Sequence, residues 1–204
     1  MKCRFCKQPA GFMKGYHKEC YESAESTMKQ LERVVNEYKD YDVVPAKAKD
    51  EIIKVVSSNE LYRNHLEYQI IDKKAIHTSE IVIHVEYGMT IRESKNRCKM
   101  VETGYRYEKK PVWNESNLIL DKSGTVIFTD KAVYLYVGSQ TMRYPYNKIV
   151  NIGFEKSWAA VYAYFDVKTS SPFAHRFEIS SYVKEKNSEK EQNICLFLHC
   201  LSGK

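Results

Sequence analysis

SGTVIFTDKAVYLYVGSQTMRYPYNKIVNIGF, residues 123–154, is a series of short runs rich in Tyr, Val, Ile and Phe. Residues of these types are enriched in β-strands, and the turn signals at Thr129–Lys131 and Gly138–Ser139 separate the runs from one another. The stretch therefore predicts consecutive short strands joined by tight turns, as in an antiparallel meander.

Strand signals continue on both sides of this stretch. In EIVIHVEYG, residues 80–88, every second residue from Ile81 to Tyr87 is apolar, which is the period of a half-buried strand. AAVYAYFDV, residues 159–167, and FAHRFEIS, residues 173–180, extend the series. We therefore predict a curved antiparallel sheet of six or more strands.

A helix is predicted after the last strand. Ser188 and Glu191 have the spacing of a capping box, which favours a helix start at Ser188. The apolar residues that then share one helical face are Ile194, Phe197, Leu198 and Leu201. We predict that this helix plugs one opening of a β-barrel. Cys195 is expected to pack in the core, and a Cys195–His199 pair at four-residue spacing is the alternative.

Potential metal ligands are concentrated at the N-terminus. Three of the six cysteines and one of the six histidines fall within residues 3–20, as Cys3-x2-Cys6 and His17-x2-Cys20. Zn²⁺ favours four such ligands in a tetrahedron, and so short a segment cannot bury enough apolar surface to fold without a metal. We predict one structural Zn²⁺, with unligated or redox-active thiols as the alternative.

A helical period without Gly or Pro begins at Glu19, so that His17 and Cys20 fall on one face of a helix start. A turn that supplies two ligands and a helix start that supplies two more resembles a treble-clef zinc finger, which we assign to residues 1–40. Residues 41–78 are predicted to form short helices in which His65 packs at an interface. Residues 79–204 form the predicted barrel.

The central stretch also carries a family resemblance. Its elements are Thr129-Asp130-Lys131, the apolar run Val133 to Val137, Arg143, and Pro145 with Ile149 and Ile152. They resemble the core of bacterial pleckstrin-homology-like (PH-like) and GRAM-like domains, and GMTIRES, residues 88–94, resembles the segment that precedes this core. The usual Arg after the turn lysine is Ala132 here. The resemblance covers about residues 80–201.

The resemblance implies a domain that binds a protein segment or an anionic lipid, at the open end of the barrel or along a strand edge. The predicted fold class is therefore α+β: an N-terminal treble-clef zinc finger with short helices, then a PH-like antiparallel β-barrel capped by a C-terminal helix.

RESKNRCKMVETGYRYEKK, residues 92–110, has seven basic residues against three acidic ones. Such a strip can attract phosphate-bearing partners, but a solvated charged face is its commoner meaning, and we expect that meaning here. The possible anion or partner contacts are Arg92, Lys95, Arg97, Lys99, Arg106, Lys109 and Lys110. Together with Tyr105, Tyr107 and the finger, the strip supports nucleic-acid binding as the alternative function, which the acidic first helix opposes.

Patterns of catalysis and of membrane insertion are missing from the sequence. There is no nucleotide-binding glycine loop and no HExxH or GxSxG pattern. No run approaches the about 18 apolar residues of a membrane span, and the N-terminus lacks the apolar run of a signal peptide. We expect a cytoplasmic, non-catalytic binding or adaptor protein. A protein partner or an anionic membrane surface is favoured over nucleic acid, and no small-molecule substrate is inferred.

Overall fold

The computed structural model describes residues 1–11, 15–41, 43–70, 75–103, 106–111, 118–157, 160–168, 173–181 and 188–204, with the backbone alone for residues 96–103 and 106–111. The helices are α1 Lys18–Glu37, α2 Ala46–Ser58, α3 Glu60–Gln69 and α4 Glu189–Ser202. The strands are β1 Val82–Thr103, β2 Arg106–Pro111, β3 Leu118–Thr129, β4 Ala132–Val137, β5 Gln140–Pro145, β6 Ile149–Lys156, β7 Val161–Lys168 and β8 Phe173–Ser181. The predicted α+β class is confirmed.

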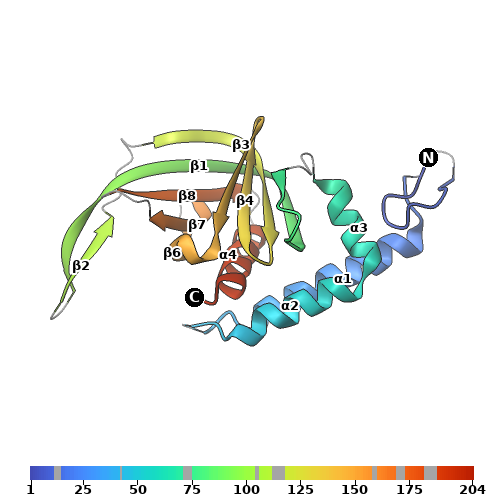
Figure 1. Ribbon diagram of the computed structural model, residues 1–204, viewed down its shortest axis with the longest axis horizontal. Helices are drawn as coiled ribbons and strands as arrows, with labels where there is room; N and C mark the ends of the chain where they lie inside the picture. The colour runs from blue at the N-terminus through green and yellow to red at the C-terminus, as the bar shows by residue number, and fades with distance from the viewer. Residues whose placement is uncertain are drawn as a thin grey trace.

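The strands form one antiparallel sheet in the spatial order β5-β4-β3-β1-β8-β7-β6, and β2 pairs with β1 alone. The sheet curls strongly, as Figure 1 shows. A single 3-10 turn, Tyr146–Lys148, joins β5 to β6, yet no pairing links these two strands among the described residues. The predicted barrel is therefore a curled sheet with two free edges.

The C-terminal helix covers the inner side of the curled sheet. All four residues of its predicted apolar face are buried: Ile194, Phe197, Leu198 and Leu201. The helix packs against β6, β7 and β8, and Figure 1 shows it beneath these strands. Because these side chains fill the space that the curvature creates, the predicted helical cap is confirmed.

The predicted capping box at the start of α4 is wrong. Ser188 is the N-cap residue, but its hydroxyl makes no capping hydrogen bond and lies 3.2 Å from Lys156 Nζ. Glu191 Oε1 instead accepts hydrogen bonds from the Ser181 backbone N–H and hydroxyl, both at 2.6 Å. The carboxylate therefore ties the first turn of α4 to the end of β8.

The three N-terminal helices pack on one another and against α4 and β1. Asn59 caps α3 by accepting from the Tyr62 backbone N–H at 3.1 Å, and its side-chain nitrogen donates to Thr27 Oγ1 of α1 at 2.7 Å. Apolar side chains of the helices and the sheet form one continuous core. The division at 1–40, 41–78 and 79–204 stays a prediction. None of the described helices is long and apolar enough to cross a membrane.

The half-buried strand predicted for residues 80–88 has an exception at His84. This residue occupies a polar position of the alternation but is only 3% exposed. Its ring stacks on Phe197 of α4 at 4.9 Å, and its Nδ1 lies 3.4 Å from the Tyr62 hydroxyl of α3. Because helices before and after the sheet both reach this part of β1, little of it remains for solvent.

The turn Thr129–Lys131, which belongs to the family resemblance, has a structural role. Asp130 Oδ1 accepts from the Ile81 backbone N–H at 2.8 Å, and Lys131 Nζ donates to the Ser79 carbonyl at 2.7 Å. These bonds hold the segment that leads into β1 against the β3–β4 turn. The motif thus positions the chain entering the sheet.

Candidate functional site

The four predicted metal ligands lie together. The ligand atoms of Cys3, Cys6, His17 and Cys20 are all within 4.8 Å of one another. His17 Nδ1 is 3.3 Å from Cys6 Sγ and 3.8 Å from Cys20 Sγ. In a tetrahedral zinc site with Zn–S of about 2.3 Å and Zn–N of about 2.0–2.1 Å, sulfur and nitrogen ligands are about 3.6 Å apart. The four residues therefore fit Zn²⁺ in number, type and spacing.

A hydrogen-bonded turn presents the first two cysteines. The Lys7 backbone N–H donates to the Cys3 carbonyl at 2.9 Å, and the Cys3 N–H donates to the Gln8 carbonyl at 2.8 Å. Lys7, directly after Cys6, has a φ of 62° in the left-handed region, which is uncommon for a residue with a side chain. The turn from Cys3 to Lys7 keeps the two thiols within 4.8 Å of each other.

The start of α1 presents the other two ligands. His17 is the N-cap residue of α1 and Cys20 lies in its first turn, which confirms the predicted placement at a helix start. His17 Nε2 donates to the Pro9 carbonyl at 3.0 Å. This bond assigns the proton to Nε2, so the lone pair of Nδ1 faces the thiols. A second hydrogen bond of this kind is what metal-binding histidines typically make.

The thiols differ in their electrostatic surroundings. Burial raises the pKa of Cys3, but backbone hydrogen bonds at Cys6, His17 and Phe5 outweigh burial and lower the pKa to about 6. Burial and the neighbouring thiols raise the pKa of Cys20 to about 11. The lowered pKa of Cys3 favours its thiolate form, which can bind a cation. The raised pKa of Cys20 reflects burial first and then the repulsion between thiolates, which a divalent ion would relieve.

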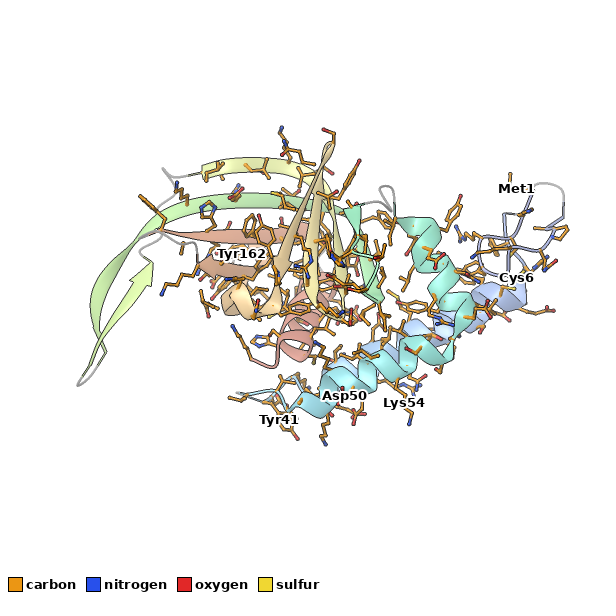
Figure 2. The ribbon with its side chains drawn as sticks, in the orientation of Figure 1. Met1, Cys6, Tyr41, Asp50, Lys54 and Tyr162 are labelled. Carbon is orange, nitrogen blue, oxygen red and sulfur yellow. The ribbon has the colours of Figure 1, made fainter. Side chains whose placement is uncertain are left out.

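The finger packs against α3. Phe5 is 1% exposed, and its ring stacks on His65 at a centroid distance of 4.6 Å, with Tyr16 and Tyr21 edge-on at 6.3 Å each. Burial lowers the pKa of His65 to about 4, so the predicted interfacial histidine is neutral at pH 7. Figure 2 shows Cys6 beside the start of α1. Sequence analysis assigned no role to Phe5, although an aromatic residue between two ligands was an available signal.

A pocket of about 350 Å³ opens where β1, β3 and the β4–β5 turn meet. Glu93 lines it, and Glu93 Oε1 pairs with His175 Nδ1 of β8 at 2.5 Å. Both apolar and polar residues line it, among them Leu120, Lys122, Gly138, Gln140 and Met142. The pocket is large enough for one side chain of a partner.

The basic strip divides between the sheet and a ribbon formed by β1 and β2. Arg92 lies 3.2 Å from Asp121 and 3.9 Å from Glu178, so its charge is compensated within the sheet. Lys95 is exposed, with Nζ 4.6 Å from the ring centroid of Phe173. The candidates of which only the backbone is described are Arg97, Lys99, Arg106, Lys109 and Lys110. Tyr105 lies outside the described residues, and the side chain of Tyr107 is not described.

The thiols of α4 pack as core residues. Cys195 is 7% exposed and Cys200 is 1% exposed, and burial raises the pKa of each to about 12. His199 Nδ1 lies 2.6 Å from the Lys204 carbonyl. Core packing of Cys195 is confirmed, and its thiol is protonated at neutral pH.

Comparisons with known proteins give little beyond this geometry. No family model matches the chain, and no curated protein matches it. Among solved structures, the Vps36 N-terminal PH domain is similar over 60% of this chain and 82% of that domain, with a TM-score of 0.38 and 9% sequence identity. This similarity is too weak to carry an argument. The bacterial and GRAM-like parts of the resemblance stay predictions.

Proposed function

We propose that the protein is a non-catalytic, cytoplasmic binding or adaptor protein. In this proposal a structural zinc finger is joined to a PH-like domain that binds a segment of a protein partner or an anionic membrane surface. The observation that carries the proposal is the curled sheet, which α4 caps on its inner side and which leaves two strand edges free among the described residues.

The metal part of the proposal has support in the ligand geometry. Four protein ligands close a tetrahedron and leave no open position for a substrate, which is the arrangement of structural zinc sites. Since the finger packs on α3 through Phe5, the ion would also stabilise the contact between the finger and the helices.

A free strand edge supports the protein-binding part. β6 pairs with β7 on one side only, contains no proline, and includes Val150, which is 50% exposed. Free backbone N–H and C=O groups on such an edge can pair with an added extended segment. The other edge strand, β5, ends at Pro145, which lacks the N–H needed for pairing. The β6 edge is therefore the better candidate for protein binding.

Elemental analysis tests the metal. The full chain purified without added metal should contain one zinc per molecule. Cys20→Ser should lose most of it, whereas His77→Gln, at an exposed histidine outside the cluster, should keep it. Co²⁺ added to the metal-free chain should give the absorption spectrum of a tetrahedral thiolate site. Zinc content near zero in the unsubstituted chain would contradict the assignment.

Site-specific crosslinking tests the protein partner. A photoreactive amino acid is placed at Val150 in the native host, and at Lys54 as a matched control, because Lys54 is exposed on α2 and points away from the sheet (Figure 2). A discrete crosslinked protein from position 150 and none from position 54 would support binding at the β6 edge. Equal crosslinking at both positions, or none at 150, would argue against it.

A further inference from the structure

The far ends of β1 and β2 form a two-stranded ribbon beyond the rest of the sheet. β1 pairs with β3 as far as Ser94 and with β8 as far as Arg97. From Cys98 to Thr103 it pairs with β2 alone. Figure 1 shows the ribbon projecting from the sheet at the end of the molecule opposite the finger. No layer of described residues therefore covers either face of the ribbon.

The pairing register sorts the charged residues of the ribbon by face. Residues two apart on a strand share a face, and so do residues directly opposite on paired strands. Lys99 lies opposite Lys110, and Thr103 lies opposite Arg106. One face, which we term the basic face, therefore carries Lys99, Arg106 and Lys110 with Glu108 in the ribbon. It continues along β1 into the sheet with Arg97, Lys95 and Glu93, and Glu93 pairs there with His175. The opposite face carries one of each sign, Lys109 and Glu102.

Two features make the basic face a candidate for anion binding. Like charges directly opposite on paired strands destabilise the pair, so the Lys99–Lys110 position is unfavourable unless an anion compensates it. Lys95, the member whose side chain is described, is exposed, and its Nζ lies over the ring of Phe173. Five of the seven basic residues of the strip thus lie on one face.

The composition of the basic face favours a nucleic acid over a lipid surface. Binding at a membrane interface usually adds buried apolar side chains to the basic ones. Within the ribbon the apolar Met100 and the aromatic Tyr107 share the opposite face, and Val101 is the apolar residue on the basic face. A polar, basic face suits a phosphate backbone, because binding to phosphates requires positive charge and does not require apolar side chains that insert into a lipid layer.

The dimensions of the ribbon also favour duplex DNA. Two strands lie about 4.8 Å apart, and the major groove of B-form DNA, about 12 Å wide, admits a two-stranded β-ribbon. The acidic helix α1 does not oppose such binding. It starts at the finger, at the other end of the molecule, and surface charges farther apart than about 10 Å are largely screened in physiological salt.

We propose that the basic face of the β1–β2 ribbon binds the phosphate backbone of duplex DNA, with the ribbon in the major groove. The finger takes no part in this contact, because it lies at the opposite end of the molecule. The inference goes beyond the proposed function and does not rest on it, since the β6 edge and the ribbon are separate surfaces.

Salt-dependent binding to a labelled DNA duplex tests the proposal. The full-length protein is titrated against a random-sequence duplex of about 20 base pairs, and binding is followed by fluorescence anisotropy between about 50 and about 200 mM salt. Five phosphate contacts predict a log–log slope of about −4.5, a loss of affinity of about 500-fold over this range. The triple variant Lys99→Gln, Arg106→Gln and Lys110→Gln should reduce the slope to about −2.

A matched control removes the same charge elsewhere. This triple variant combines Lys39→Gln just after α1, Lys54→Gln on α2 and Lys109→Gln on the opposite face of the ribbon. It should keep at least the slope expected for five contacts. The double variant Lys99→Arg and Lys110→Arg preserves charge and should bind as the unsubstituted chain does. Thermal melts confirm that each variant is folded.

Two further arms separate DNA from other anions. The protein is tested against vesicles that contain phosphatidylserine and against polyglutamate. The proposal requires that the basic-face variant lose DNA affinity relative to the matched control. It is overturned if both triple variants bind DNA equally, if polyglutamate binds as tightly as the duplex, or if the basic-face substitutions reduce vesicle binding and leave DNA binding unchanged.

Discussion

Replacing Glu80 should destabilise the protein strongly, although this residue precedes the first strand and lies near the surface. Its side chain is 1% exposed. Oε1 accepts from Arg143 Nε at 2.9 Å and Nη2 at 2.5 Å, and Oε2 accepts from the hydroxyls of Thr129 at 2.7 Å and Tyr134 at 3.0 Å. These bonds join the entry segment to β3, β4 and β5.

The magnitude follows from the loss of charge and of one acceptor in Glu80→Gln, which keeps the size of the side chain. With the amide oxygen on Arg143, the amide nitrogen faces the two hydroxyls, which must turn to accept from it at a cost of about 1 kcal/mol each. A hydrogen bond to a charged group contributes about 1 kcal/mol more than a neutral one, and the two Arg143 bonds lose about half of that difference each, because the Arg143 side chain is 35% exposed and screened by solvent. The expected destabilisation is about 3 kcal/mol, which lowers the melting temperature by about 6–12 °C.

The effect should also depend on pH. Burial raises the pKa of Glu80, but hydrogen bonds from the two hydroxyls and the guanidinium outweigh it and hold the pKa below its usual value of 4.5. A lowered folded-state pKa stabilises the protein above pH 4.5, and this contribution is lost as the pH falls through the folded-state pKa. The difference between the unsubstituted chain and Glu80→Gln should therefore be largest at neutral pH and shrink below pH 4.5.

Thermal and urea unfolding measured at several pH values check this reasoning. Glu155→Gln, at an exposed position on β6, is the matched control and should change stability by less than about 0.5 kcal/mol. A Glu80→Gln variant as stable as this control at pH 7, or a difference that grows on acidification, would refute the role assigned to the carboxylate.

Four other positions give independent tests. At Gly153 an added Cβ would lie 2.4 Å from the Tyr164 ring, so Gly153→Ala should lower the free energy of unfolding, measured in urea, by about 1–3 kcal/mol. The same substitution should lower it by less when Tyr164 is also replaced by Ala, because the clash is then removed. Because burial raises the pKa of Cys195 and Cys200 to about 12, iodoacetamide at pH 8 should modify neither in the folded protein, as mass spectrometry would show. Lys7 has a φ of 62°, which glycine adopts easily and a β-branched residue does not. The melting temperature of Lys7→Gly should therefore be no lower than that of the unsubstituted chain, whereas Lys7→Val should lower the free energy of unfolding by about 1–2 kcal/mol.

Local patterns in the sequence were enough to predict several features correctly. The spacing of Cys3, Cys6, His17 and Cys20 predicted a cluster that the structure confirms, because two ligand pairs on a turn and a helix start are brought together by short-range geometry. The apolar period after Ser188 predicted α4 and its buried face for a similar reason. The zinc ion itself stays a prediction.

Features that depend on packing between distant segments were decided by the tertiary structure. Glu191 forms no capping box because its carboxylate accepts instead from the backbone N–H and the hydroxyl of Ser181, at the end of β8. His84 became buried because α3 and α4 both reach its strand. The meaning of the basic strip also required the fold. A strand exposes alternate residues to opposite faces, and only the register between β1 and β2 determines that Lys99 lies opposite Lys110 and that five of the seven basic residues of the strip share one face.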